Sequence, residues 1–109
     1  MKIPKRFKLL GHTIEVSTSN EQYYEKKTYG SCSFEGKWIK LVNPSEHHPI
    51  TQGSLEQTFL HELVHLCLYH TEQNKLGDNE AFVDLMSALI HQALTTMEYK
   101  EDHKEESTK

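Results

Sequence analysis

Three residues of this sequence, His61, Glu62 and His65, form the pattern H-E-x-x-H and are those best suited to carry out chemistry. In a helix, His61 and His65 share one face because they are four residues apart, so both imidazoles can reach the same metal ion. Glu62 would stand beside that ion, where its carboxylate can hold a water molecule without being a ligand. Two histidines and a later carboxylate leave a fourth position for this water, which is typical of a catalytic zinc site.

The residues around this pattern predict a buried helix. Positions 59–68 read FLHELVHLCL, which is apolar on nearly every side. Three ionisable groups in such a helix need partners, and a metal ion supplies them. The alternative is a chance match, since the chain has eight histidines and many glutamates. In the same helix Cys67 is expected to be a small core residue, and a disulfide with Cys32 is not favoured.

Helix boundaries follow from capping signals. Ser54 and Gln57 fit a capping box, so the first helix is expected to start at Ser54 and to continue to about residue 72. Residues 74–77 interrupt the helical pattern. Asp78 or Asn79 then caps a second helix that runs to about residue 97.

The second helix offers a third metal ligand. Glu80 and Asp84 are four residues apart and share a face. Glu80 is the expected third ligand, because catalytic zinc takes three protein ligands. Asp84 would accept a hydrogen bond from the distal ring nitrogen of a ligating histidine and so fix its tautomer. The competing interpretation is a solvated face, since both residues belong to a polar stripe at helical spacing.

Other candidates for the third ligand rank lower. His70 lies nine residues after His61, and no glycine turns the chain between them, as the pattern H-E-x-x-H-x-x-G-x-x-H requires. Glu72 and Asp78 stand at or beyond helix ends. His91 would lie about 16 Å along the helix axis from Glu80, too far to share an ion. The loop residues His47 and His48 could only polarise a carbonyl from above the site.

Strand signals precede the helices. Residues 13–16 read TIEV, and residues 29–34 and 37–42 predict a hairpin across Glu35 and Gly36. Because strands come first and helices after, the expected class is α+β, with a small antiparallel sheet of about three strands packed on two helices. Residues 1–98 would form a single domain, and residues 99–109 a charged, disordered tail.

Composition narrows the function. The 109 residues carry a net charge of −4, and no basic face is expected, so nucleic-acid binding is disfavoured. The start of the chain is basic but lacks the apolar run of a signal peptide, and no stretch approaches transmembrane length. Two cysteines make no disulfide framework. The simplest expectation is a cytoplasmic protein without a membrane partner.

At this point the sequence resembles the gluzincins, the thermolysin-like zinc metallopeptidases. Their H-E-x-x-H pattern matches His61–His65, and their later N-E-x-x-x-D pattern matches Asn79–Asp84. The short chain looks like phage- and prophage-encoded members related to the ImmA/IrrE group. The resemblance spans roughly residues 1–97 and is strongest over 54–84. It implies a minimal zincin-like domain that binds Zn²⁺.

Carried over by position, the resemblance implies His61, His65 and Glu80 as metal ligands and Glu62 as the catalytic carboxylate. It implies that Asp84 accepts a hydrogen bond from a ligating histidine. It also implies hydrolysis of peptide bonds in a protein or peptide substrate, in an enzyme of phage or prophage regulation. An extended substrate would pair with strand 37–42 as an added strand. No Tyr or His is matched to the family's transition-state-stabilising group. The alternative is therefore a zinc-binding interaction or regulatory domain without turnover.

Overall fold

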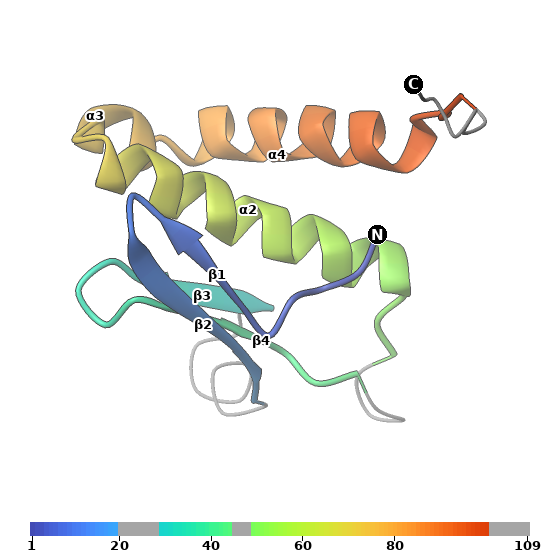
Figure 1. The fold of residues 1–109 in the computed structure, drawn as a ribbon, viewed down its shortest axis with the longest axis horizontal. Coiled ribbons are helices and arrows are strands. Elements are labelled where there is room, and N and C mark those ends of the chain that lie inside the picture. Colours follow the sequence, from blue (N-terminus) through green and yellow to red (C-terminus); the bar gives the residue numbers. More distant parts are fainter. Residues whose placement is uncertain (20–28, 45–48, 101–109) are drawn as a thin grey trace, which may run out of the picture.

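The computed structural model describes residues 1–19, 29–44 and 49–100, and within them the chain is α+β with strands before helices (Figure 1). The sheet has four strands in the order β1-β2-β4-β3. Their bounds are Arg6–Leu9 (β1), His12–Thr18 (β2), Gly30–Ser33 (β3) and Trp38–Leu41 (β4).

The sheet is mixed, so the expectation of three antiparallel strands was wrong. β2 runs parallel to β4, whereas β1 pairs with β2 and β3 with β4 in antiparallel fashion. The fourth strand arises at Leu10 and Gly11, where φ is +48° and +83°. Two successive positive φ angles make a tight hairpin turn that splits the first apolar segment into β1 and β2.

The hairpin predicted across Glu35 and Gly36 is confirmed. In its register Cys32 lies opposite Ile39 and Ser33 opposite Trp38. The Gly36 amide donates a hydrogen bond to Ser33 Oγ at 2.8 Å and closes the turn. Because β4 is enclosed between β2 and β3, it offers no free edge. The expectation that strand 37–42 pairs with a substrate was therefore wrong, and β3 is the last strand on this side of the sheet among the described residues.

Three helices follow: α2 (Gln52–His70), the short α3 (Asn74–Gly77) and α4 (Glu80–Thr96). The prediction of a capping box at Ser54 was wrong. Thr51 caps α2, and its hydroxyl accepts a hydrogen bond from the Ser54 amide. Gln57 instead donates to Ser87 Oγ of α4 at 2.9 Å. The cap predicted at Asp78 or Asn79 is Asn79, whose side chain accepts a hydrogen bond from the Phe82 amide.

The elements stack in three layers: the sheet, then α2, then α4 (Figure 1). The core between the sheet and α2 is formed by Ile14, Ile39, Leu41, Phe59, Leu60 and Leu66. α4 packs on α2 and α3, and Figure 1 shows it on the side of α2 away from the sheet. The sheet thus packs on α2, and α4 covers α2 rather than the sheet.

Cys67 is exposed, contrary to its expected place in the core.

Among the described residues no helix is both long and apolar enough to span a membrane. Residues 99 and 100 follow α4 without regular structure and are exposed. The rest of the expected disordered tail, 101–109, lies outside the described residues, as do His47 and His48.

Candidate metal centre

The two histidines of the H-E-x-x-H pattern point at each other from successive turns of α2. Nε2 of His61 lies 3.1 Å from Nε2 of His65. The spacing of four residues brings the rings to one side of the helix, as the sequence predicts. Two ring nitrogens that converge in this way can act as ligands of one ion.

The opposite nitrogen of each ring already has an acceptor. Nδ1 of His61 lies 2.7 Å from Oδ1 of Asp84, and Nδ1 of His65 lies 2.8 Å from the carbonyl oxygen of Gly77. Both acceptors require a proton on Nδ1, so a neutral ring carries its lone pair on Nε2. The surroundings thereby select the tautomer that presents both lone pairs to the same point.

Glu80, the first residue of α4, places its carboxylate at that point. Its Oε1 lies 3.1 Å from Nε2 of His61, and its Oε2 lies 3.3 Å from Nε2 of His65. The three candidate ligand atoms lie within 4.8 Å of one another. Glu80 and Asp84 thus reach the two histidines of α2, while most of each carboxylate side chain remains exposed to solvent.

These distances suit a small tetrahedral ion. Zn–N distances of about 2.0–2.1 Å place two tetrahedral ligands about 3.3 Å apart. The two ring nitrogens are 3.1 Å apart, and Glu80 approaches one of them at 3.1 Å through Oε1 and the other at 3.3 Å through Oε2, while one ligand atom from each residue gives separations within 4.8 Å. A single proton could bridge only one of these pairs at a time, whereas one cation serves all three ligands. Two nitrogens and one carboxylate oxygen are also a ligand set that zinc accepts.

Glu62 lies beside this group, with its side chain buried except for about 7% of its surface. Burial raises the pKa of Glu62, while a hydrogen bond from the Cys32 thiol and the nearby His61 and His65 oppose the shift. β3 approaches closely, since a Cβ at Gly30 would lie 3.4 Å from Oε2 of Glu62. A carboxylate with a raised pKa in a confined site is suited to act as a general base.

A cavity of about 550 Å³ opens over these groups. It is lined by Tyr29, Gly30, Gln57, Thr58, His61, Glu62, His65, Glu80 and Asp84. A second cavity of about 410 Å³ shares Tyr29, Gln57 and Thr58 with the first and continues to Pro49 and Ile50. Together they form a groove along α2 that is polar at the histidines and more apolar at its far end.

Two supports of the site were missed by the sequence analysis. The Gly77 carbonyl accepts hydrogen bonds from His65 and, at 3.1 Å, from the Tyr69 hydroxyl. The Tyr69 ring stacks on the His65 ring at an interplanar angle of 12°. Burial and a hydrogen bond to Asp78 raise the pKa of Tyr69 to about 12, so its hydroxyl remains a donor. The spacing of four residues from His65 to Tyr69 was the available signal for this contact.

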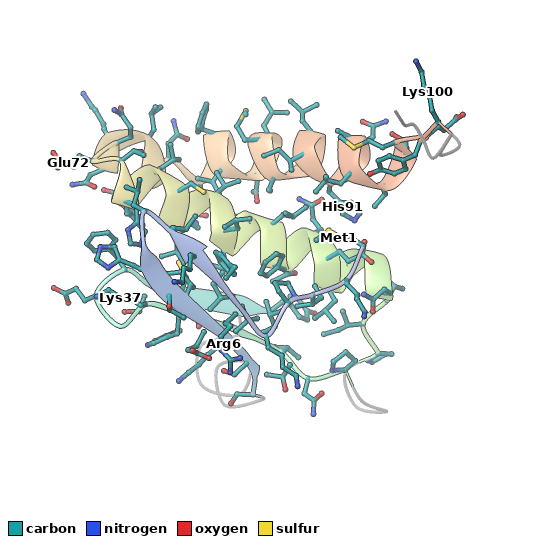
Figure 2. All side chains as sticks on the ribbon, viewed as in Figure 1. Met1, Arg6, Lys37, Glu72, His91 and Lys100 are labelled. Carbon is teal, nitrogen blue, oxygen red and sulfur yellow. The ribbon has the colours of Figure 1, made fainter. Side chains whose placement is uncertain are left out.

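The other histidines ranked as candidates make different contacts. His70 packs against Phe34, with ring centroids 4.7 Å apart, and against His12. His91 Nε2 lies 2.9 Å from Oε1 of Glu56, near the N-terminal half of α2 (Figure 2). Neither belongs to the group formed by His61, His65 and Glu80.

Comparison with known proteins adds no relative: the sequence and its fold match no family model, no curated protein and no solved structure.

Proposed function

We propose that this chain is a zinc-dependent metallopeptidase with a minimal zincin-like, gluzincin-type domain. One observation carries the proposal. His61 and His65 are held in the tautomer that directs both Nε2 lone pairs to a carboxylate of Glu80, and the buried Glu62 lies next to this point. The resemblance of Asn79–Asp84 to the second gluzincin motif supports the same assignment.

His61, His65 and Glu80 would hold the zinc ion, and Asp84 and the Gly77 carbonyl would orient the two imidazoles. When bound, zinc supplies a Lewis acid that polarises a carbonyl and lowers the pKa of a coordinated water. Glu62 would accept a proton from the attacking water molecule as the water oxygen adds to the scissile carbonyl. The same carboxyl group then delivers the proton to the leaving amine as the C–N bond breaks.

The groove favours an extended peptide as the substrate. β3 is the last strand in the order of the described sheet, and its residue Gly30 lines the cavity together with Glu62. A peptide that lies extended in this cavity would pass the candidate metal centre. The neighbouring cavity at Pro49 and Ile50 would receive an apolar side chain of the substrate.

A second candidate function is a zinc-binding interaction domain without turnover. The exposure of Glu80 and Asp84 favours this function. Their side chains are 67% and 71% exposed, so the site is open to solvent on this side. A water-filled site weakens every electrostatic contribution to catalysis.

Cleavage of a proteome-derived peptide library, read by mass spectrometry of new termini, distinguishes the two functions. Glu62→Gln keeps the shape of the side chain but cannot accept the proton, so cleavage should fall by roughly 10²–10⁴-fold. Glu98→Gln, an exposed carboxylate beyond α4, should cleave as the wild type does. If the zinc-loaded wild type produces no cuts that depend on Glu62, the interaction domain is the better account.

A further inference from the structure

The groove along α2 has a further cavity beyond the candidate metal centre, toward the C-terminal end of the helix. We call this cavity of about 460 Å³ the distal pocket, and it is lined by Phe34, Tyr69, Glu72, Asn74 and Asp78. The stacked rings of His65 and Tyr69 stand between the two cavities, since His65 lines the first and Tyr69 the second. The distal pocket and the apolar cavity at Ile50 therefore lie on opposite sides of the metal centre along α2.

One wall of the distal pocket is aromatic. Phe34 follows β3 and is 45% exposed, and its ring meets the Tyr69 ring edge to face, with centroids 6.5 Å apart at an interplanar angle of 71°. The Tyr69 hydroxyl donates a hydrogen bond to Oδ1 of Asp78 at 2.7 Å, so this ring is held in place. The faces of aromatic rings attract cations, and a planar guanidinium group also stacks on them.

The groove as a whole is acidic. Among the described residues that line its three cavities there is no Lys or Arg. Five carboxylates line them: Glu62, Glu72, Asp78, Glu80 and Asp84. A bound zinc ion would offset two of these negative charges. Lys37 and Lys75, the basic residues closest along the chain to the distal pocket, do not line it. The charge of the groove thus favours a cationic group and opposes an anionic one.

An organic cation suits the distal pocket better than a metal ion does. Oδ1 of Asp78 already accepts the Tyr69 hydroxyl, and the described lining offers one further carboxylate, that of Glu72. Figure 2 shows Glu72 at the end of α2 that adjoins α3. Hard cations such as Ca²⁺ take six to eight oxygen ligands, and the aromatic wall supplies none. A guanidinium group can use both the rings and the carboxylates.

We propose, on the basis of the proposed peptidase function, that the distal pocket is a subsite for an Arg or, less tightly, a Lys side chain of the peptide substrate. The substrate class is then a peptide with a basic residue on one side of the cleaved bond and an apolar residue on the other. Tyr69 follows Thr58 of the apolar cavity by eleven residues of α2, or about 17 Å. An extended peptide covers this distance in about five residues.

Matched peptides with Arg, Lys or Gln at each position around the cleaved bond test this proposal. Cleavage by the zinc-loaded full chain, followed by mass spectrometry, should give a kcat/KM about tenfold higher for Arg than for Gln at one position, with Lys between them. Glu72→Gln keeps the shape of the side chain and removes its charge. It should lower the ratio of Arg to Gln cleavage by about threefold, as expected for an exposed ion pair.

Glu35→Gln is the matched control. Glu35 is an exposed carboxylate next to Phe34 in the chain and does not line the distal pocket, so this variant should keep the wild-type ratio. An equal fall of the ratio in Glu35→Gln and Glu72→Gln would overturn the subsite. If Glu72→Gln fails to fold by circular dichroism, the ratio of Arg to Gln cleavage in the wild type decides alone.

The outcomes distinguish the subsite from the peptidase function. Cuts that depend on Glu62 but are equally fast for Arg and Gln at every position would overturn the subsite and leave the peptidase function intact. If no cut depends on Glu62, the peptidase function fails. Fluorescence anisotropy with the zinc-loaded Glu62→Gln protein then tests the subsite: the Arg peptide should bind about tenfold more tightly than the Gln peptide, and equal affinities would overturn the proposal.

Discussion

Asp84 Oδ1 lies 2.7 Å from Nδ1 of His61, on the side of the ring opposite the candidate metal centre. The carboxylate therefore acts on the site through the imidazole, by holding the proton on Nδ1 and raising the basicity of Nε2. His65 has the carbonyl of Gly77 in the same role. The two histidines are thus supported by different elements, one by α4 and the other by the end of α3.

The first prediction concerns Asp84. Asp84→Ala should lower zinc affinity by about 10- to 100-fold, the usual cost of losing such a partner. Asp84→Asn should cost less, because the amide oxygen still accepts the Nδ1 hydrogen bond. Competition with a zinc-binding dye measures both, and Glu98→Ala is the control. Unchanged zinc affinity in Asp84→Ala would show that His61 does not depend on this carboxylate.

The second prediction concerns Gly77. Its carbonyl oxygen accepts the hydrogen bond from His65, and the absence of a side chain leaves room for the Tyr69 ring. A Cβ at Gly77 would lie 2.6 Å from Cε1 of Tyr69, so Gly77→Ala must displace the ring that stacks on His65. We expect a loss of about 1–3 kcal/mol in the free energy of unfolding, as for other overpacked sites, together with weaker zinc binding.

Gly53→Ala is the matched control for this substitution. A Cβ at Gly53 meets nothing within 4 Å, and the position lies in the first turn of α2. The same change there should raise the free energy of unfolding by about 0.4–1 kcal/mol, measured by urea denaturation. Equal effects at the two glycines would contradict the packing described for Tyr69.

The third prediction is a pH dependence that arises at Glu56. A hydrogen bond with His91 lowers the pKa of Glu56 below its ordinary value of 4.5, assisted by Gln52 and the amino group of Met1 and opposed by burial. Because the folded pKa is the lower one, this stabilisation is fully present above about pH 4.5 and is lost as the pH falls through the folded pKa.

Urea midpoints measured from neutral to acidic pH test this dependence. Glu56→Gln should be less stable than the wild type at neutral pH, and the difference should shrink on acidification. His91→Gln removes the principal donor and should change the profile in the same direction. A difference between wild type and Glu56→Gln that stays constant with pH would rule out this linkage.

The fourth prediction separates the two residues able to cap α2. Thr51→Ala should cost about 1 kcal/mol of stability, because Thr51 Oγ1 accepts the hydrogen bond from the Ser54 amide at 3.1 Å. Ser54→Ala should have a clearly smaller effect. Thermal unfolding of the two variants decides between them, and the reverse order would restore the capping box predicted from the sequence.

The local parts of the site could be read from the sequence, because helical spacing alone brings His61 toward His65 and places Glu80 and Asp84 on one face. The tertiary contacts of the site could not be predicted from the sequence. The acceptor for His65 is a backbone carbonyl, and every residue has one, so no residue type identifies Gly77. Similarly, the sequence does not indicate that residues in the stripe from Glu80 to His91 contact α2, because Glu80 and Asp84 combine these contacts with large exposure to solvent.

The sheet was predicted incompletely for related reasons. Alternation of apolar residues identifies a strand but not the direction of its neighbour, so the parallel pairing of β2 with β4 was not visible. The turn between β1 and β2 places Leu10 at positive φ, a conformation that leucine rarely adopts and that sequence patterns do not indicate. Thr51 and Ser54 are equally good capping residues, and their geometry alone distinguishes them.

The most direct test of the proposed centre is X-ray absorption spectroscopy at the zinc edge on the full chain loaded with one equivalent of zinc. We expect a shell of nitrogen and oxygen at about 2.0–2.1 Å, with multiple scattering from two imidazoles. Glu80→Ala should alter this shell, and His70→Ala should leave it unchanged. A sulfur shell at about 2.3 Å, or a spectrum with the signature of a single imidazole, would contradict the assignment of His61, His65 and Glu80 as the ligands.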